Sequence, residues 1–209
     1  MATHPTHDDG VIKFNCDWQR SGPIECDRIS PLIHWRDQMF AAGIIGVYPD
    51  GIGYGNISLR DSPDTFLVSG TQTGHLEHTT PQHYTRVHRW DIPQNTLQCC
   101  GPVAASSESL THAALYQYSP TIQAIIHGHH PQLWHQYKDV LPTTRAEVPY
   151  GTPAMAAEMW RLLDRGLRRR RILVMAGHED GLLAFGDSLA AAAQVFLELL
   201  APCSDDHFD

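Results

Sequence analysis

The chain has no apolar run of the length that a membrane-spanning helix requires, which is about 18 residues. Its first ten residues, MATHPTHDDG, are polar and no apolar segment follows them, so we expect no secretory signal peptide. Basic residues are also scarce: 15 Lys and Arg stand against 23 Asp and Glu, giving a net charge of -8. That balance argues against a general nucleic-acid binder. We therefore expect a cytoplasmic protein with neither a nucleic acid nor a membrane as partner.

Cysteine motifs are absent as well. The five cysteines are odd in number and form no CxxC pair, so neither a disulfide framework nor a cysteine-based zinc site is expected, and a reducing cytosol suits them. We interpret the adjacent Cys99 and Cys100 as strand residues. The full set is Cys16, Cys26, Cys99, Cys100 and Cys203.

Length and pattern predict one domain that mixes strands with helices. At 209 residues and 42% hydrophobic content the chain can bury a full core, and it contains no internal repeat or linker. A helix is expected after Ser30-Pro31, as N-cap and first helical residue, with Gly43 as its stop. Short apolar segments between Gly-rich or Asp/Pro-rich turns then predict an antiparallel meander. Further helices are expected over 108–118, after Thr152-Pro153 and from about Ser188, so that a mixed sheet has helices on both faces.

The most informative motif is His127-Gly128-His129, at the end of the apolar run TIQAII. Side chains alternate along a strand, so both imidazoles leave the same face. Two neutral imidazoles on one face are half of a transition-metal site. Since the chain has 14 histidines, an accidental HxH is not rare, and other segments must supply the missing ligands.

Two other segments supply them. Glu108 lies nineteen residues before His127, and His178 lies in AGHEDG about fifty residues after it. Three histidines with a carboxylate nearby leave one coordination position open, which is typical of a catalytic site rather than a structural one. The rival HxH sites fit less well, because a cupin needs a Glu shortly after the second His and a metallo-β-lactamase needs an HxHxDH sequence.

In its order of motifs the chain resembles the class II aldolase/adducin family over roughly residues 30 to 200. Any one motif is weak alone, but six in the family's order are specific. They are Gly55-Asn56-Ile57-Ser58, Ser69-Gly70 followed by Thr80-Pro81, Ser106-Ser107-Glu108, His127-x-His129, Pro149-Tyr150-Gly151-Thr152, and His178 before Gly181-Leu182-Leu183.

The resemblance implies a three-layer α/β/α fold around a central mixed, mostly antiparallel sheet. It divides the chain into an N-terminal extension (1–29, with 1–10 expected to be disordered), a main domain (30–200) and a tail (201–209). It also implies a zinc-dependent lyase that acts on a small, phosphorylated sugar or hydroxycarbonyl compound through an enediolate, and a homotetramer. Epimerisation, decarboxylation, dehydration and a non-catalytic assembly role stay open.

The same resemblance assigns residue roles. It implies His127, His129 and His178 as ligands of one Zn²⁺ per subunit, and Glu108 as the catalytic acid/base. Its substrate- and phosphate-binding positions are Asn56, Ser69, Gly70, Ser106 and Ser107. The two last serines stand where a helix is expected to begin, and the free N–H groups of a helix N-terminus favour an anion. Capping alone is the competing interpretation of these serines.

Three departures from the family pattern leave questions open. Glu179-Asp180 replace the glycine that usually follows the third histidine, and either carboxylate could reach the metal or a ligand's N–H, or extend into solvent. The segment that carries a tyrosine proton donor in the aldolase is missing, and only Tyr137 and Tyr150 follow the HxH motif. Residues 11–29 have no family counterpart.

Overall fold

The structure is a computed structural model that describes residues 10–25 and 27–201. The parts of our disorder and tail predictions that concern residues 1–9 and 202–209 lie outside the described residues. The eight strands of the main sheet run in the order β1-β7-β6-β5-β4-β8-β10-β9. Their bounds are β1 Asn15–Arg20, β4 Asn56–Ser62, β5 Thr65–Ser69, β6 Tyr84–Asp91, β7 Thr96–Gly101, β8 Ala124–His129, β9 Ile172–Val174 and β10 Gly181–Gly186.

All neighbouring strands of this sheet pair antiparallel except β1, which runs parallel to β7. The predicted mixed, mostly antiparallel sheet is thus confirmed, and β4 to β7 form the expected meander. The apolar segment IIGVY over 44–48 is the first of the short segments expected to form strands, but it contributes only β2 (Gly46–Val47), which pairs with β3 (Gly53–Tyr54) in a separate two-stranded sheet. A backbone contact explains this, because the Ile44 carbonyl accepts the N–H of His129 on β8.

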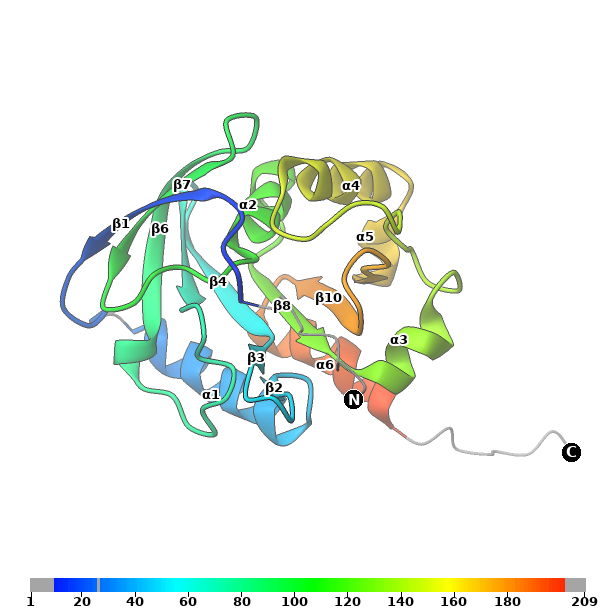
Figure 1. The fold of residues 1–209 in the computed structure, drawn as a ribbon, viewed down its shortest axis with the longest axis horizontal. Coiled ribbons are helices and arrows are strands. Elements are labelled where there is room, and N and C mark those ends of the chain that lie inside the picture. Colours follow the sequence, from blue (N-terminus) through cyan, green and yellow to red (C-terminus); the bar gives the residue numbers. More distant parts are fainter. Residues whose placement is uncertain (1–9, 26, 202–209) are drawn as a thin grey trace, which may run out of the picture.

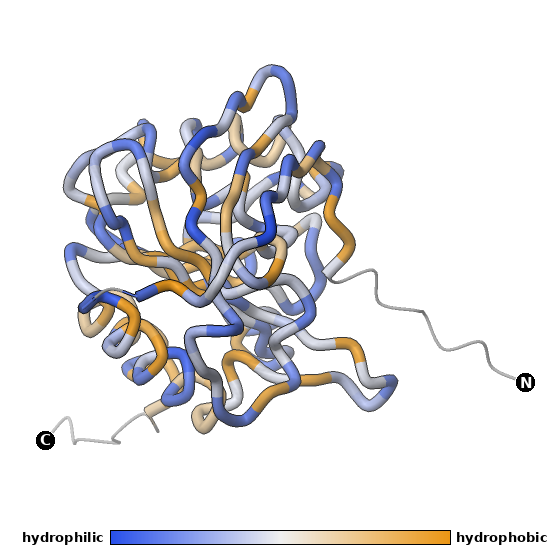
Figure 2. Tube along the Cα trace, turned by 90° about the vertical axis from the view of Figure 1, so that its left-hand side faces the viewer, coloured by the Kyte–Doolittle hydropathy of each residue, from blue (hydrophilic) through white to orange (hydrophobic). Residues whose placement is uncertain are grey.

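Helices cover both faces of the sheet, as Figure 1 shows. One core lies between the sheet and α2, α4 and α5, and the other between the sheet and α1, α3 and α6. In Figure 2 the hydrophobic segments gather in the middle of the molecule, where the strands run. The bounds are α1 Ile29–Ala41, α2 Ser109–Tyr118, α3 Pro131–Tyr137, α4 Pro153–Asp164, α5 Leu167–Arg170 and α6 Leu189–Leu200, with a 3₁₀ turn over Pro81–His83.

Local capping signals predicted the helix ends with mixed success. Thr152 and Ser188 accept backbone N–H bonds at the starts of α4 and α6 as expected, and Gly43 follows α1 with φ +74. The N-cap of α1 is Arg28 rather than Ser30, and that of α2 is Glu108 rather than Ser107. Neither of these N-caps makes a side-chain capping bond, so tertiary packing rather than a local cap holds both helix starts.

The predicted N-terminal extension is part of the main sheet. Its strand β1 pairs with β7 over six residues, from Asn15 opposite Thr96 to Arg20 opposite Gly101. Ahead of it, Phe14 is buried in the core beneath α2 and α4. Residues 10–20 are therefore built into the fold rather than appended to it.

Candidate metal centre

Strand β8 places two histidines at the edge of a cavity. His127 and His129 project from the same face, with ring centroids 4.8 Å apart, as the two-residue period requires. Gly128 between them faces the opposite side, where an added Cβ would lie 2.7 Å from the backbone oxygen of Ile44. The glycine thus permits the Ile44 backbone to pack against β8, and that contact holds the strand end that carries both imidazoles.

The third histidine comes from the tight turn between β9 and β10. The N–H of His178 bonds to the carbonyl of Met175, and its own carbonyl accepts the N–H of Gly181. Asp180 completes the turn with φ +61. Because β10 pairs with β8, with Gly181 opposite His129, this turn delivers His178 to the HxH pair. The ring of His178 lies 5.0 Å from that of His127 and 4.6 Å from that of His129, between centroids.

Ring-nitrogen contacts decide which atoms face the cavity. Nδ1 of His127 lies 3.0 Å from the carbonyl oxygen of Leu182, which can only accept, so this nitrogen carries the proton. Nδ1 of His129 lies 2.5 Å from the hydroxyl of Tyr48. With both Nδ1 atoms engaged, the two Nε2 atoms face each other at 3.0 Å.

This arrangement fits a metal ion. One ligand atom from each of the three buried histidines lies within 4.8 Å of the others. A tetrahedral zinc site with Zn–N bonds of about 2.0–2.1 Å would hold its nitrogens about 3.3–3.4 Å apart. Nε2 of His127 and Nε2 of His129 lie close enough together to share one ion. Three imidazole nitrogens at this spacing form a donor set that suits Zn²⁺ or a similar divalent ion.

Glu108 reaches the histidines from the N-terminus of α2. Its side chain is 1% exposed, and its Oε1 lies 3.4 Å from Nδ1 of His178. Burial acts to raise the pKa of Glu108, but the close approach of His178 and the charge that His127 carries when it is protonated act against burial and hold the pKa below its usual value. Glu108 is therefore a carboxylate at neutral pH, in the form that accepts a proton.

A buried polar chain lies one helical turn further along α2. Nδ1 of His112 lies 2.8 Å from the hydroxyl of Ser58, which lies 2.8 Å from the hydroxyl of Tyr116. Burial lowers the pKa of His112 to about 3, so this imidazole is neutral at physiological pH. It fastens α2 to β4 behind Glu108, and the HxH-based sequence reasoning did not single it out.

The cavity beside the histidines brings together most of the predicted substrate-binding residues. Asn56, Gly70, Ser106 and Ser107 line it together with Glu108 and the three histidines. Ser69 is not among the lining residues: its hydroxyl accepts the N–H of Ile57 at 3.1 Å, which ties β5 to β4. An anion-binding role for Ser69 stays a prediction.

The rest of the cavity wall was not predicted. Gly10, Gly53, Tyr54 and residues 71–74 also line it. The buried guanidinium of Arg36 on α1 holds the 71–74 loop, donating to the carbonyls of Thr73 at 2.9 Å and Gly74 at 3.0 Å. No local motif could have revealed this contact, because Arg36 and the loop are almost forty residues apart.

The structure places the residues whose roles the sequence left open. Glu179 is exposed, whereas Asp180 is buried and its charge contributes to raising the pKa of Tyr54, after burial itself. Tyr150 stacks on the ring of His178 at 4.3 Å between centroids. The Nζ of Lys13 lies 3.4 Å from the centroid of the Tyr150 ring, and the Tyr150 hydroxyl donates to the carbonyl of Val11 at 3.4 Å. Tyr150 thus packs between a candidate ligand and the N-terminal segment.

Fold and site together define an α/β protein with a buried three-histidine, one-carboxylate centre at one end of its sheet. The sequence matches the model of the class II aldolase and adducin N-terminal domain over residues 50–204. The chain therefore belongs to the class II aldolase and adducin family, as its motifs indicated. No curated protein matches the sequence.

Solved structures share the fold at low sequence identity. An L-fuculose 1-phosphate aldolase is similar with a TM-score of 0.61 and 19% identity, over 85% of each chain. A sugar-phosphate aldolase from Thermotoga maritima gives 0.60 and 15%, over 82% of this chain and 90% of that one. YgbL from Klebsiella pneumoniae, a candidate aldolase, epimerase or decarboxylase, gives 0.59 and 21%, over 82% and 84%.

No helix in residues 10–25 and 27–201 combines the length and apolar character needed to cross a bilayer.

Proposed function

We propose that this protein is a metal-dependent lyase of the aldolase type, with Zn²⁺ held by His127, His129 and His178. The observation that carries the proposal is the convergence of three buried imidazoles and the buried carboxylate of Glu108 on one cavity. Three imidazole nitrogens and a carboxylate at this spacing form the kind of donor set that binds a divalent transition-metal ion.

A divalent cation in this centre would supply Lewis-acid stabilisation of negative charge that develops on a substrate oxygen. The chain's own residues provide the rest. Glu108, ionised and shielded from bulk water, accepts a proton from a substrate hydroxyl or carbon and returns it later in turnover. The Leu182 carbonyl and the Tyr48 hydroxyl keep the two Nε2 atoms of the HxH pair pointed into the cavity.

The substrate we propose is a small hydroxycarbonyl compound that carries a phosphate. Ser106 and Ser107 line the cavity directly before the first turn of α2, and Asn56 and Gly70 face the same space. A helix N-terminus offers N–H groups and a favourable dipole to an anion. Two of the three similar structures described above are named as a sugar-phosphate aldolase and an L-fuculose 1-phosphate aldolase, which supports this class of substrate.

Metal analysis and a substrate screen test the proposal together. We expect one divalent ion per chain in the parent protein and a clear loss in His127→Ala and His178→Ala. The zinc-loaded protein is then screened against phosphorylated and free ketoses and ulosonic acids for aldehyde release. Full metal occupancy in either variant would show that the ligand set is wrong.

Glu108→Gln tests the proton carrier. This change keeps the size of the side chain and removes its ionisable group, so we expect metal and fold to be retained and turnover to fall by about 10²- to 10⁴-fold. Glu179→Gln is the matched control, because it makes the same change on an exposed carboxylate next to His178. Near-parental turnover in Glu108→Gln would remove Glu108 from the acid/base role.

Product analysis separates the related reactions. Release of an aldehyde supports cleavage, whereas inversion at one carbon, loss of CO₂ or loss of water would replace the lyase by an epimerase, decarboxylase or dehydratase. A protein that binds neither metal nor any of these substrates would fit an adducin-like assembly module instead.

A further inference from the structure

Two thiols that are far apart in the sequence lie close together at the outer edge of the sheet. Cys16 lies on β1 and Cys99 on β7, and their Sγ atoms are 3.7 Å apart. In the parallel pairing Cys16 is opposite Leu97, and Cys99 lies two residues further along β7 on the same face. Cys100 follows on the other face, so it cannot take part in this contact.

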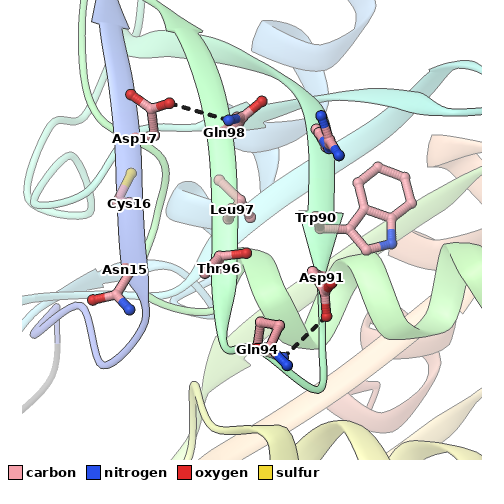
Figure 3. A pocket seen from close by; sticks show the side chains of 10 residues that line it. Asn15, Cys16, Asp17, Trp90, Asp91, Gln94, Thr96, Leu97 and Gln98 are labelled. Atoms are coloured by element: carbon pink, nitrogen blue, oxygen red, sulfur yellow. Dashed lines mark hydrogen bonds between the residues drawn. The ribbon is translucent and has the colours of Figure 1, made fainter.

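The two sulfurs differ in their access to solvent. Cys99 is fully buried in the core beneath α2, whereas Cys16 is half-buried. Cys16 also lines an open hollow of about 800 Å³ together with Leu97 and Trp90. Figure 3 shows the Cys16 side chain on β1 at the level of Leu97 on β7, facing this hollow. A small solute can therefore reach Cys16 without any unfolding of the core.

The contact also makes one proton of the pair easy to lose. The hydrogen bond from Cys16 lowers the pKa of Cys99 to about 7, against the opposing effect of burial, and the backbone N–H of Ala105 adds to the lowering. The pKa of Cys16 is raised in turn, so the pair holds its second proton firmly. Either sulfur can donate in this contact, and Cys16 is the one of the two that a solute reaches from the hollow.

We propose that Cys16 and Cys99 form a dithiol that a peroxide oxidises to a reversible disulfide. The Cys16 sulfur attacks one peroxide oxygen, forming an S–O bond as the O–O bond breaks, and the released hydroxide takes up the Cys16 proton to become water. Cys99 then attacks the resulting sulfenic acid, an S–S bond replaces the S–O bond, and a second water leaves. The two thiols lose two electrons in total, and the peroxide accepts them.

The position of β1 makes the closing step feasible. A disulfide requires an S–S distance of about 2.0 Å, so the sulfurs must approach by about 1.7 Å. β1 is an edge strand, and β7 is its one neighbour among the described strands, so β1 can shift without disturbing another of them. The disulfide would join residues 83 positions apart. It would thereby link the N-terminal segment covalently to β7, and Gly10 of that segment lines the metal-centre cavity. The dithiol does not depend on the proposed lyase activity.

Peptide mapping tests the proposal directly. The purified full chain is treated with hydrogen peroxide, alkylated, and digested with trypsin. Cleavage after Lys13 and Arg20 releases Cys16 in FNCDWQR, apart from Cys26, while Cys99 falls in the 90–138 peptide. We expect these two peptides to be linked, with a loss of two thiols per chain that dithiothreitol reverses.

Three variants sharpen the result. Cys100→Ser is the matched control and should form the same link as the parent protein. Cys99→Ser should leave a sulfenic acid on Cys16 that dimedone captures, whereas Cys16→Ser should give no dimedone adduct on the buried Cys99.

The proposal is overturned if FNCDWQR stays unlinked in the folded protein under peroxide that oxidises the urea-unfolded chain. It is also overturned if the link requires Cys100, or if Cys99 rather than Cys16 is the residue that dimedone captures.

Discussion

Tyr48→Phe should weaken metal binding without disturbing the fold. The substitution removes one oxygen, which lies 2.5 Å from Nδ1 of His129, and keeps the aromatic ring that packs 4.6 Å from Tyr54 between centroids. With the hydroxyl gone, the His129 imidazole loses a hydrogen-bond partner of Nδ1, which in the metal-bound state would accept the Nδ1 proton. Its ring can then rotate or place the proton on Nε2, the nitrogen needed for the metal.

The size of the effect follows from what replaces the lost contact. Removing an outer partner of a ligating histidine typically costs about 10- to 100-fold in metal affinity. Tyr48 is only half-buried, so a water molecule can take over part of its hydrogen bond. We therefore expect the lower end of that range, about tenfold, which corresponds to about 1.4 kcal/mol and is typical of one hydrogen bond.

The assay is a competition for Zn²⁺ between the protein and a colorimetric chelator, with melting curves to confirm the fold. Tyr54→Phe is the matched control, because Tyr54 contacts the same imidazole through its ring face, 5.4 Å between centroids and 28° from parallel. It should keep the parental affinity within about twofold, well inside the tenfold effect expected for Tyr48→Phe. Equal affinities in the parent protein and both variants would refute the view that Tyr48 sets the proton position on His129.

Three further expectations concern the anion site, acid stability and assembly. Ser107→Ala should raise the Michaelis constant more than it lowers turnover, and inorganic phosphate should compete with substrate; absence of competition would remove phosphate from the proposed substrate. Because burial lowers the folded-state pKa of His112 to about 3, below the unfolded value of about 6.5, the unfolded chain binds the extra proton and stability falls as the pH drops through 6.5. Between neutral pH and pH 4, the unfolding free energy of the metal-free parent protein should therefore fall by about 3 kcal/mol more than that of His112→Gln, as measured by urea titration. Equal losses in the two proteins would contradict a buried neutral imidazole. Light scattering should show a homo-oligomer, with a tetramer expected from the family resemblance, and a 23.4 kDa monomer at micromolar concentration would count against it.

Much of the fold was predictable because strands and helices leave local patterns. The meander from β4 to β7 and the helix over α4 follow from apolar periodicity with turn and capping residues between them. The errors fall where a distant contact overrides the local pattern. The segment around Ile44 has the composition of a strand, yet its carbonyl bonds to His129 and only two of its residues pair as β2.

The histidines show the same contrast between local pattern and tertiary contact. Its two-residue spacing placed both rings on one face without any knowledge of the sheet, whereas the approach of His178 depends on β10 pairing with β8. The sequence offered His178 and Glu108 as candidates and the family resemblance assigned their roles, but only the tertiary structure brings both of them to the HxH pair.

The sequence by itself predicted the HxH pair, the starts of α4 and α6, and the family, because each rests on short-range spacing or on motif order. Only the tertiary structure decided that the N-terminal strand runs parallel to β7, that Tyr48 holds His129, and that Cys16 faces Cys99. The physical reason is that these contacts join residues about eighty positions apart. Their partners are selected by how the whole sheet packs and which side chains it buries, and no local preference of the chain encodes that choice.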